Sequence, residues 1–337
     1  MSRRPLIGQA ACRQPRTFAW AHRLGAYIEL TKARLVALVL ITTVVGFLLG
    51  AGEPLRWELL AWTVIGTALA ALGANAFNQV MERRLDRRME RTRRRPLPAG
   101  DLGTGEAAVM AVGMMIAGPA LLAIFVNTLA AGLALAAALI YLAIYTPLKT
   151  RSPLCTLVGA ICGALPPMVG WSATTGRLDA GAWVLGAVLF LWQIPHFLAL
   201  AWLYREDYAR GGFRMLPLLD RHGDVTTIVI ILYSLALLPA CLAATMAGLA
   251  GWAYAAASLL LGGGLVALAL ELRRRRTRTC ARRVFLASIL YLPLLLGFMV
   301  ADRGPITNPV QLLGSDNRAA DSAAVHPEQA SPDDRLS

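Results

Sequence analysis

One polar segment of the chain combines acidic, amide and basic side chains at a regular spacing. In the run NAFNQVMERRLDRRMERTRRRPLPAG, Asn78, Glu82 and Asp86 are four residues apart. That spacing puts three oxygen-bearing side chains on one face of a helix. Magnesium prefers oxygen ligands and usually binds through one or two carboxylates plus substrate phosphates. This face can therefore hold the metal, and the neighbouring arginines can donate bidentate hydrogen bonds to a diphosphate.

A second polar segment, WQIPHFLALAWLYREDYARGGFRMLP, has a similar organisation. Its apolar helix ends in Glu206 and Asp207, and Tyr208 and Arg210 follow directly. Two acidic clusters of this kind can clamp a magnesium diphosphate between them. The alternative for each cluster alone is charge balance, because Glu and Asp also neutralise the arginines that collect in cytoplasmic loops. The presence of two similar segments favours chemistry over charge balance.

A histidine and two basic residues are further candidates. His196 lies inside an apolar helix, directly after Pro195, and a polar residue within a membrane span is a functional candidate by default. Histidine ligates haem iron in several protein classes, although a packing role, with a hydrogen bond to a backbone carbonyl, is the alternative. Lys149 and Arg151 either add cations to the same site or anchor the membrane interface.

The elements that position these residues are apolar runs of membrane-spanning length. The chain is 57% hydrophobic and only 16% charged, which is too apolar for an ordinary soluble domain. About 20 apolar residues span a bilayer core as a helix. Nine such runs are expected, at 35–52, 58–80, 107–126, 129–147, 154–173, 181–203, 225–247, 251–271 and 284–301. The pattern predicts an all-α membrane protein.

The basic residues predict the orientation. If the connections between spans alternate sides, 28 of the 33 Lys and Arg residues fall on one side, which the positive-inside rule makes cytoplasmic. The same clustering argues against nucleic-acid binding as the reason for the net charge of +13. We therefore expect a cytoplasmic segment 1–34, a nine-helix domain 35–301 and a disordered external tail 302–337.

The cysteines argue against a zinc or disulfide protein, and the N-terminal segment bears on where the protein is located. The five cysteines form no C-x-x-C pair, which gives no case for zinc or a disulfide framework. Arginines interrupt the first thirty residues, so no cleaved signal peptide is expected there. An Arg-rich start is also typical of mitochondrial transit peptides, but the short leader favours a bacterial inner-membrane location.

The two polar segments also resemble a known family. The patterns are N-x-x-x-E-x-x-x-D-x-x-M-x-R-T-x-x-R-P from Asn78 to Pro96, and W-Q-x-P-H-F with R-E-D-Y-x-x-G-G-x-x-M-L from Trp192 to Leu216. Together with the segments YTPLK and GALPPMVGW, they resemble the protohaem farnesyltransferase (haem O synthase) branch of the intramembrane aromatic prenyltransferases. The resemblance covers residues 25–300. The second motif has Gly211 where many superfamily members have another Asp, which fits the haem branch better than the quinone branch.

The resemblance implies a fold, a reaction and a set of site residues. The fold is nine transmembrane helices around a central cavity open to the cytoplasmic side. The reaction transfers a farnesyl group from farnesyl diphosphate to a vinyl group of haem B, with Mg²⁺ as cofactor. The implied catalytic residues are Asn78, Glu82, Asp86, Glu206 and Asp207, of which Glu82, Asp86 and Asp207 hold the metal. The implied substrate-binding residues are Asn75, Arg91, Thr92, Arg95, Lys149, Arg151, His196, Tyr208 and Arg210.

The resemblance also implies partners and leaves two rival functions. Membrane lipid surrounds the protein, and haem A synthase or terminal-oxidase assembly factors are candidate protein partners. One rival is a prenyltransferase of the same superfamily that acts on a quinone precursor or a chlorin. The other is a non-catalytic haem carrier or transporter, against which the carboxylates argue, because they lie at helix exits rather than at the bilayer midplane.

Overall fold

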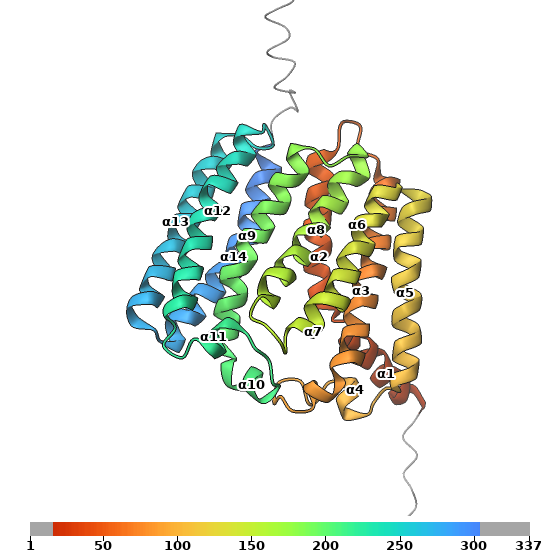
Figure 1. The fold of residues 1–337 in the computed structure, drawn as a ribbon. Coiled ribbons are helices and arrows are strands. Elements are labelled where there is room, and N and C mark those ends of the chain that lie inside the picture. The colour runs from red at the N-terminus through yellow and green to blue at the C-terminus, as the bar shows by residue number, and fades with distance from the viewer. Residues whose placement is uncertain (1–15, 304–337) are drawn as a thin grey trace, which may run out of the picture.

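The computed structural model describes residues 16–303, and every regular element in that range is a helix. Nine of the described segments are long and apolar enough to cross a membrane, which confirms the predicted all-α membrane fold (Figure 1). They are α2 (Ala33–Gly50), α3 (Trp57–Asp86), α5 (Thr104–Phe125), the joined helices of Thr128–Leu148, α8 (Cys155–Thr175), α9 (Ala180–Leu203), α12 (Asp224–Met246), α13 (Trp252–Arg275) and α14 (Arg278–Ala301). The Thr128–Leu148 span consists of α6 (Thr128–Leu139), the π-helix η1 (Ile140–Tyr145) and α7 (Thr146–Leu148).

Short helices gather at one end of the bundle. These are α1 (Arg16–Leu30), α4 (Pro96–Ala99), α10 (Arg205–Arg210) and α11 (Leu216–Leu219), and they lie at the same end as α7 (Figure 1). The connections from α3 to α5, from α9 to α12 and from α13 to α14 are all at this end. Together with the helix ends that flank them (83–106, 204–224 and 272–283), these connections contain 19 of the 33 basic residues of the chain. We call this end the basic end; its assignment to the cytoplasm stays a prediction.

The spans pack as two groups that meet at α8 and α9. α2, α3, α5, the Thr128–Leu148 span and α8 form the first group, and α9, α12, α13 and α14 form the second. Small residues allow close helix approach where lipid provides no hydrophobic drive. A Cβ atom on Gly46 of α2 would lie 2.0 Å from the carbonyl oxygen of Pro167, and one on Gly170 of α8 would lie 1.9 Å from that of Thr43. Glycine is therefore required at both positions for α2 and α8 to pack backbone to backbone.

The helix ends differ from the sequence prediction in two informative places. α3 continues to Asp86 instead of ending near residue 80, so the acidic face stays helical as it leaves the apolar region. α14 begins at Arg278 rather than near residue 284. The internal prolines, such as Pro119, Pro195 and Pro239, are accommodated within continuous helices. The division into a segment 1–34 and a domain 35–301 stays a prediction, and most of the expected tail 302–337 lies outside the described residues.

Candidate active site

A cavity of about 500 Å³ lies between the two groups of helices, bordered by α2, α3, the Thr128–Leu148 span, α8 and α9. Alanines of α3 and α6 line part of it: Ala70, Ala71, Ala74, Ala134, Ala137 and Ala138. Residues from the segments that follow α3 and α10, including Arg91, Arg95 and Phe213, border its polar part at the basic end. The structure therefore contains the expected central cavity, with small apolar residues in its depth and charged residues toward the basic end.

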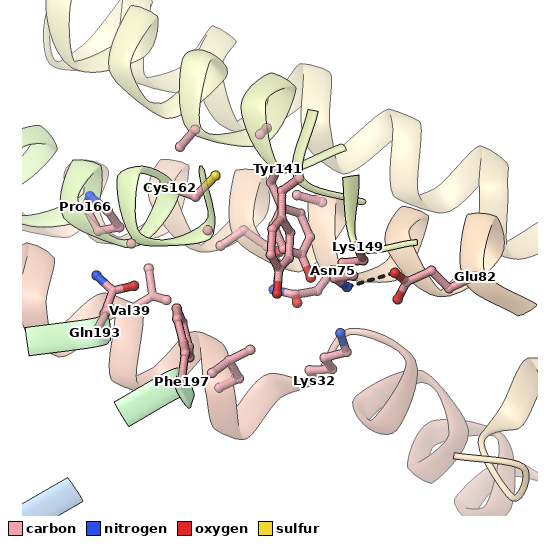
Figure 2. A pocket seen from close by; sticks show the side chains of 18 of the residues that line it. Lys32, Val39, Asn75, Glu82, Tyr141, Lys149, Cys162, Pro166, Gln193 and Phe197 are labelled. Atoms are coloured by element: carbon pink, nitrogen blue, oxygen red, sulfur yellow. Dashed lines mark hydrogen bonds and ion pairs between the residues drawn. The ribbon is translucent and has the colours of Figure 1, made fainter. Parts of the chain in front are cut away.

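The acidic face of α3 borders the cavity through Asn75, Glu82 and Asp86. Glu82 and Asp86 are only 5% and 1% exposed, so each carboxylate needs a partner. Lys149 Nζ lies 2.8 Å from Glu82 Oε1 (Figure 2). Arg95 Nη1 donates to both carboxylate oxygens of Asp86, at 3.0 and 2.9 Å. The predicted acidic face is therefore assembled together with two of the predicted cations.

Asn78 and Thr92 support this face without lining the cavity themselves. Asn78 is fully buried and its Nδ2 donates to Thr146 Oγ1 at 2.9 Å, which ties α3 to the start of α7. Thr92 Oγ1 donates to the backbone oxygen of Asp86 at 2.9 Å and so holds the chain where α3 ends. Both residues position the acidic face.

Lys32 is a cavity residue that sequence reasoning missed. It precedes α2 and borders the cavity (Figure 2). Its Nζ donates to Asn78 Oδ1 at 3.3 Å. Burial, with Arg95 and Lys149 nearby, lowers the pKa of Lys32 to about 7. Gln79 fixes the preceding turn, because its Nε2 donates to the backbone oxygens at the end of α1. The signal in the sequence was a lysine at the basic end of the first span.

Aromatic side chains form the wall opposite α2. Tyr141 and Tyr145 stack with ring centroids 5.3 Å apart, and both line the cavity. The Nζ atom of Lys149 lies 4.5 Å from the centroid of the Tyr145 ring. Burial opposes the charge of Lys149, but Glu82 together with Tyr141 and Tyr208 outweighs burial, so the pKa of Lys149 is raised above its usual value. The lysine is therefore held as a cation against an electron-rich ring face.

His196 lines the cavity from α9. Its Nδ1 lies 2.9 Å from Ser288 Oγ of α14, and its ring stacks on Trp192 and Phe285. The partner is thus a side chain and not the backbone carbonyl that a packing role was expected to use. Gln193, three residues earlier, is a second cavity residue on the same helix that sequence reasoning did not select.

The second acidic segment lies beside the first but uses its carboxylate differently. Asp207 Oδ1 accepts a hydrogen bond from the backbone N–H of Glu90 at 2.7 Å, and Oδ2 accepts one from that of Arg91 at 3.4 Å. The Arg91 guanidinium in turn lies over the rings of Tyr204 and Tyr208, 5.6 and 5.8 Å from their centroids. Asp207 therefore joins α10 to the segment that follows α3.

Several predicted residues are not brought into the cavity. Glu206, Arg210 and Arg151 are exposed and do not border it. Glu206, Asp207 and Arg210 instead line a separate surface pocket at the basic end, next to the main cavity at Arg91. Tyr208 does border the main cavity. The substrate-binding and catalytic roles of these residues stay predictions.

The donor set at the acidic face fits a magnesium ion that arrives with a phosphate. Among residues 16–303, no group of three or more His, Cys, Asp or Glu side chains is close enough to hold a metal alone. Magnesium, however, needs only one or two carboxylates when phosphates complete its shell. The buried Asn75 Oδ1, two helical turns before Glu82, accepts no hydrogen bond within the described structure, which leaves an unused oxygen in the cavity wall. Both oxygens of Asp207 face backbone amides, and its role as a metal ligand stays a prediction.

Comparison with known proteins identifies the family. The chain belongs to the UbiA prenyltransferase family, whose model matches residues 39–289. It is 43% identical over 286 residues to the protoheme IX farnesyltransferase of Solibacter usitatus, an alignment that covers 82% of this chain and 98% of that protein.

Solved structures agree on the fold. A digeranylgeranylglyceryl phosphate synthase aligns with a TM-score of 0.72 at 16% identity, over 83% of this chain and 98% of that one. A UbiA homologue from Archaeoglobus fulgidus, bound to DMAPP and Mg²⁺, aligns with a TM-score of 0.59 at 15% identity, over 81% and 98%. At this identity, these likenesses concern the arrangement of the helices.

Proposed function

We propose that this chain transfers the farnesyl group of farnesyl diphosphate to a vinyl group of protohaem (haem B), giving haem O and diphosphate. The observation that carries the proposal is a single cavity with a buried acid and cation cluster at one end, His196 in its wall and small apolar residues in its depth. Similarity to a protein named protoheme IX farnesyltransferase over 82% of the chain supports the choice of substrates.

The cation cluster suits the first chemical step. When the C–O bond at carbon 1 of the farnesyl chain breaks, both electrons leave with the diphosphate, so negative charge develops on the oxygen that was bonded to carbon 1. Lys32, Lys149 and Arg95 line the cavity at the basic end and can stabilise this charge without reorganising at the moment of reaction. Glu82 and Asp86 would hold Mg²⁺, which supplies Lewis-acid stabilisation of the same leaving group.

The apolar part of the cavity suits the second step. The vinyl group donates its π electrons to the allylic cation, a C–C bond forms, and the positive charge moves to the vinyl carbon next to the porphyrin ring. Water then adds there and loses a proton, which leaves a hydroxyethylfarnesyl substituent. The ring faces of Tyr141 and Tyr145 can stabilise the passing cation, and the alanine-lined depth excludes bulk water until that step.

We also propose that the protein lies in a bacterial inner membrane with its basic end in the cytoplasm. The 28 of 33 basic residues assigned to that side support this orientation. It would open the charged part of the cavity toward the compartment from which a water-soluble diphosphate headgroup and Mg²⁺ can arrive.

Mass spectrometry of haems extracted from cells with and without the expressed chain tests the proposed reaction. We expect a new haem, heavier than haem B by one farnesyl group plus one hydroxyl group, only when the chain is present. If the product were a prenylated quinone precursor or chlorin instead of a modified haem, the protein would have the activity of another branch of the superfamily. Haem B that copurifies with the protein without any modified product would indicate a carrier.

A further inference from the structure

The His196 ring is held rigidly at the wall of the cavity. It stacks on Trp192, with ring centroids 5.1 Å apart and planes 22° apart, and on Phe285, at 5.0 Å and 29°. Trp192 is fixed in its turn, because its indole N–H donates to the backbone oxygen of Ser288 at 2.8 Å. The plane of the imidazole is therefore set by aromatic neighbours from α9 and α14.

Ser288 decides which nitrogen of that ring carries the proton. Its hydroxyl has one hydrogen, and the Oγ atom donates it to the backbone oxygen of Phe285 at 2.7 Å. Toward His196 the same Oγ atom can then only accept, so Nδ1, at 2.9 Å, must be the protonated nitrogen. In a neutral imidazole the other nitrogen, Nε2, then carries an unprotonated lone pair. Protein ligands to metals show this arrangement, in which the second ring nitrogen donates to an outer partner.

We infer that Ser288 is a positioning residue that fixes His196 in the Nδ1-protonated form, so that Nε2 serves as an axial ligand of the haem iron during farnesyl transfer. The inference rests on the proposed function, because it takes haem as the substrate. Neutral imidazole is the form that ligates haem iron. A ligand held before the substrate arrives would fix both the distance and the orientation of the porphyrin, and so place one vinyl group against the prenyl chain.

The test compares four purified variants with the wild-type protein in detergent, and one of them, His196→Ala, removes the proposed ligand itself. Ser288→Ala removes the hydroxyl but keeps the backbone oxygen that Trp192 uses. Ser288→Thr keeps a hydroxyl on the same atom position. Ser258→Ala is the matched control, because Ser258 is also buried and its Oγ also donates to a carbonyl three residues earlier, that of Ala255 at 2.8 Å. Unlike Ser288, it has no hydrogen bond to His196. Each protein is titrated with ferric haem by absorbance and with farnesyl diphosphate by calorimetry.

We expect wild type, Ser258→Ala and Ser288→Thr to give the absorbance spectrum of nitrogen-ligated haem. Ser288→Ala is expected to lose that spectral signature in part and to bind haem at least about tenfold more weakly, the usual scale for removal of an outer partner of a metal ligand. His196→Ala should lose the signature completely. Affinity for farnesyl diphosphate should stay unchanged in all variants, which also shows that they fold.

Two outcomes overturn the inference. Ser288→Ala with the wild-type haem spectrum and affinity would show that Ser288 does not position the ligand. His196→Ala with an unchanged spectrum would show that His196 is not the ligand. Either result is compatible with haem O production in cells, whereas failure of the proposed function would appear as the absence of haem O from cells that contain the wild-type protein.

Discussion

The two acidic residues of α3 are better explained by function than by stability. Glu82 and Asp86 are buried and each makes one ion pair, with Lys149 and Arg95. Replacement of a buried ion pair by apolar residues of similar volume is often neutral or stabilising, because the free energy of desolvating two charges offsets most of the attraction between them. A membrane protein with a largely apolar interior therefore gains little stability from these pairs. Their place on the cavity wall is what a charged substrate requires.

At the residue scale, Glu82→Gln and Asp86→Asn should each abolish prenyl transfer while the protein still inserts and folds. Each change removes a negative charge that metal binding needs, and metal ions contribute several kcal/mol to stabilisation of the leaving group. A rate loss of at least about a hundredfold follows from such a value. Turnover of radiolabelled farnesyl diphosphate by purified protein, over a magnesium titration, would measure it.

Glu271→Gln provides a control for this prediction. Glu271 also lies near the basic end and pairs with Arg275 and Arg283, but it does not border the cavity. This variant should keep full activity. Normal turnover in both cavity variants would leave Glu82 and Asp86 as charge balance for the arginines around them.

The sequence predicted the acidic face but not all of its surroundings. Asn78, Glu82 and Asp86 could be recognised because a spacing of four residues repeats along one helix face, which is local information. Lys32 and Gln193 were missed because each reaches the cavity only through packing between helices that are distant in sequence. The contact between Asp207 and the amides of Glu90 and Arg91 could not be predicted from the sequence either, because it joins residues more than 110 positions apart.

At the element scale, the π-helix η1 explains how one span presents several side chains to the cavity. The Thr146 backbone N–H bonds to the oxygen of Tyr141, five residues earlier, and its hydroxyl donates to the same oxygen at 2.8 Å. Pro147 follows and has no N–H of its own to restore α-helical spacing. Short π segments of this kind are frequent at functional sites. Hydropathy patterns carry no signal for them, which is why the sequence predicted a plain span here.

The contact between α10 and the segment after α3 leads to a second prediction. Asp207→Ala should weaken farnesyl diphosphate binding, because the amides of Glu90 and Arg91 lose their acceptor and the Arg91 side chain loses its fixed place at the cavity. The expected result is a KM for farnesyl diphosphate raised about tenfold, as for the loss of hydrogen bonds to a charged group. Steady-state kinetics would separate this from an effect on kcat.

Asp207→Asn distinguishes this explanation from direct metal binding. An asparagine keeps one oxygen that can accept from the amide of Glu90, so most of the contact should survive. We therefore expect Asp207→Asn to keep more activity than Asp207→Ala. Equal and complete loss in both variants, together with a changed magnesium dependence, would instead support the metal role that the sequence motif suggested.

At the scale of the whole molecule, the number and order of the spans could be predicted because each one depends on local composition. A bilayer requires about 20 apolar residues per helix, and the nine expected runs coincide with the nine observed spans to within a few residues at most ends. The short helices at the basic end were not predicted. α4, α10 and α11 contain only four to six residues each, too few to give a periodic apolar pattern, and α1 lies before the first apolar run.

The two ends of the molecule also differ in their aromatic residues, which bears on orientation. Trp57, Trp183 and Trp252 are exposed near the starts of α3, α9 and α13, at the end opposite the basic end. Tryptophan is enriched where the hydrocarbon core meets the headgroups. These residues therefore mark one membrane interface, and the arginine-rich connections mark the other.

The last prediction is that the basic end faces the cytoplasm. That side has 28 of the 33 basic residues, and the inverted orientation would put only the other five in the cytoplasm. The positive-inside rule therefore clearly favours one orientation. Alkaline phosphatase is active only outside the cytoplasm, so fusions at the N-terminus or after Arg93 should be inactive, and a fusion after Gly176 in the connection between α8 and α9 should be active. A fluorescent protein that matures only in the cytoplasm should give the reverse pattern at each site. An active phosphatase after Arg93 would show that the topology is inverted. The charged part of the cavity would then lie on the side where farnesyl diphosphate is not made. That result would also remove the physical basis of the proposed reaction.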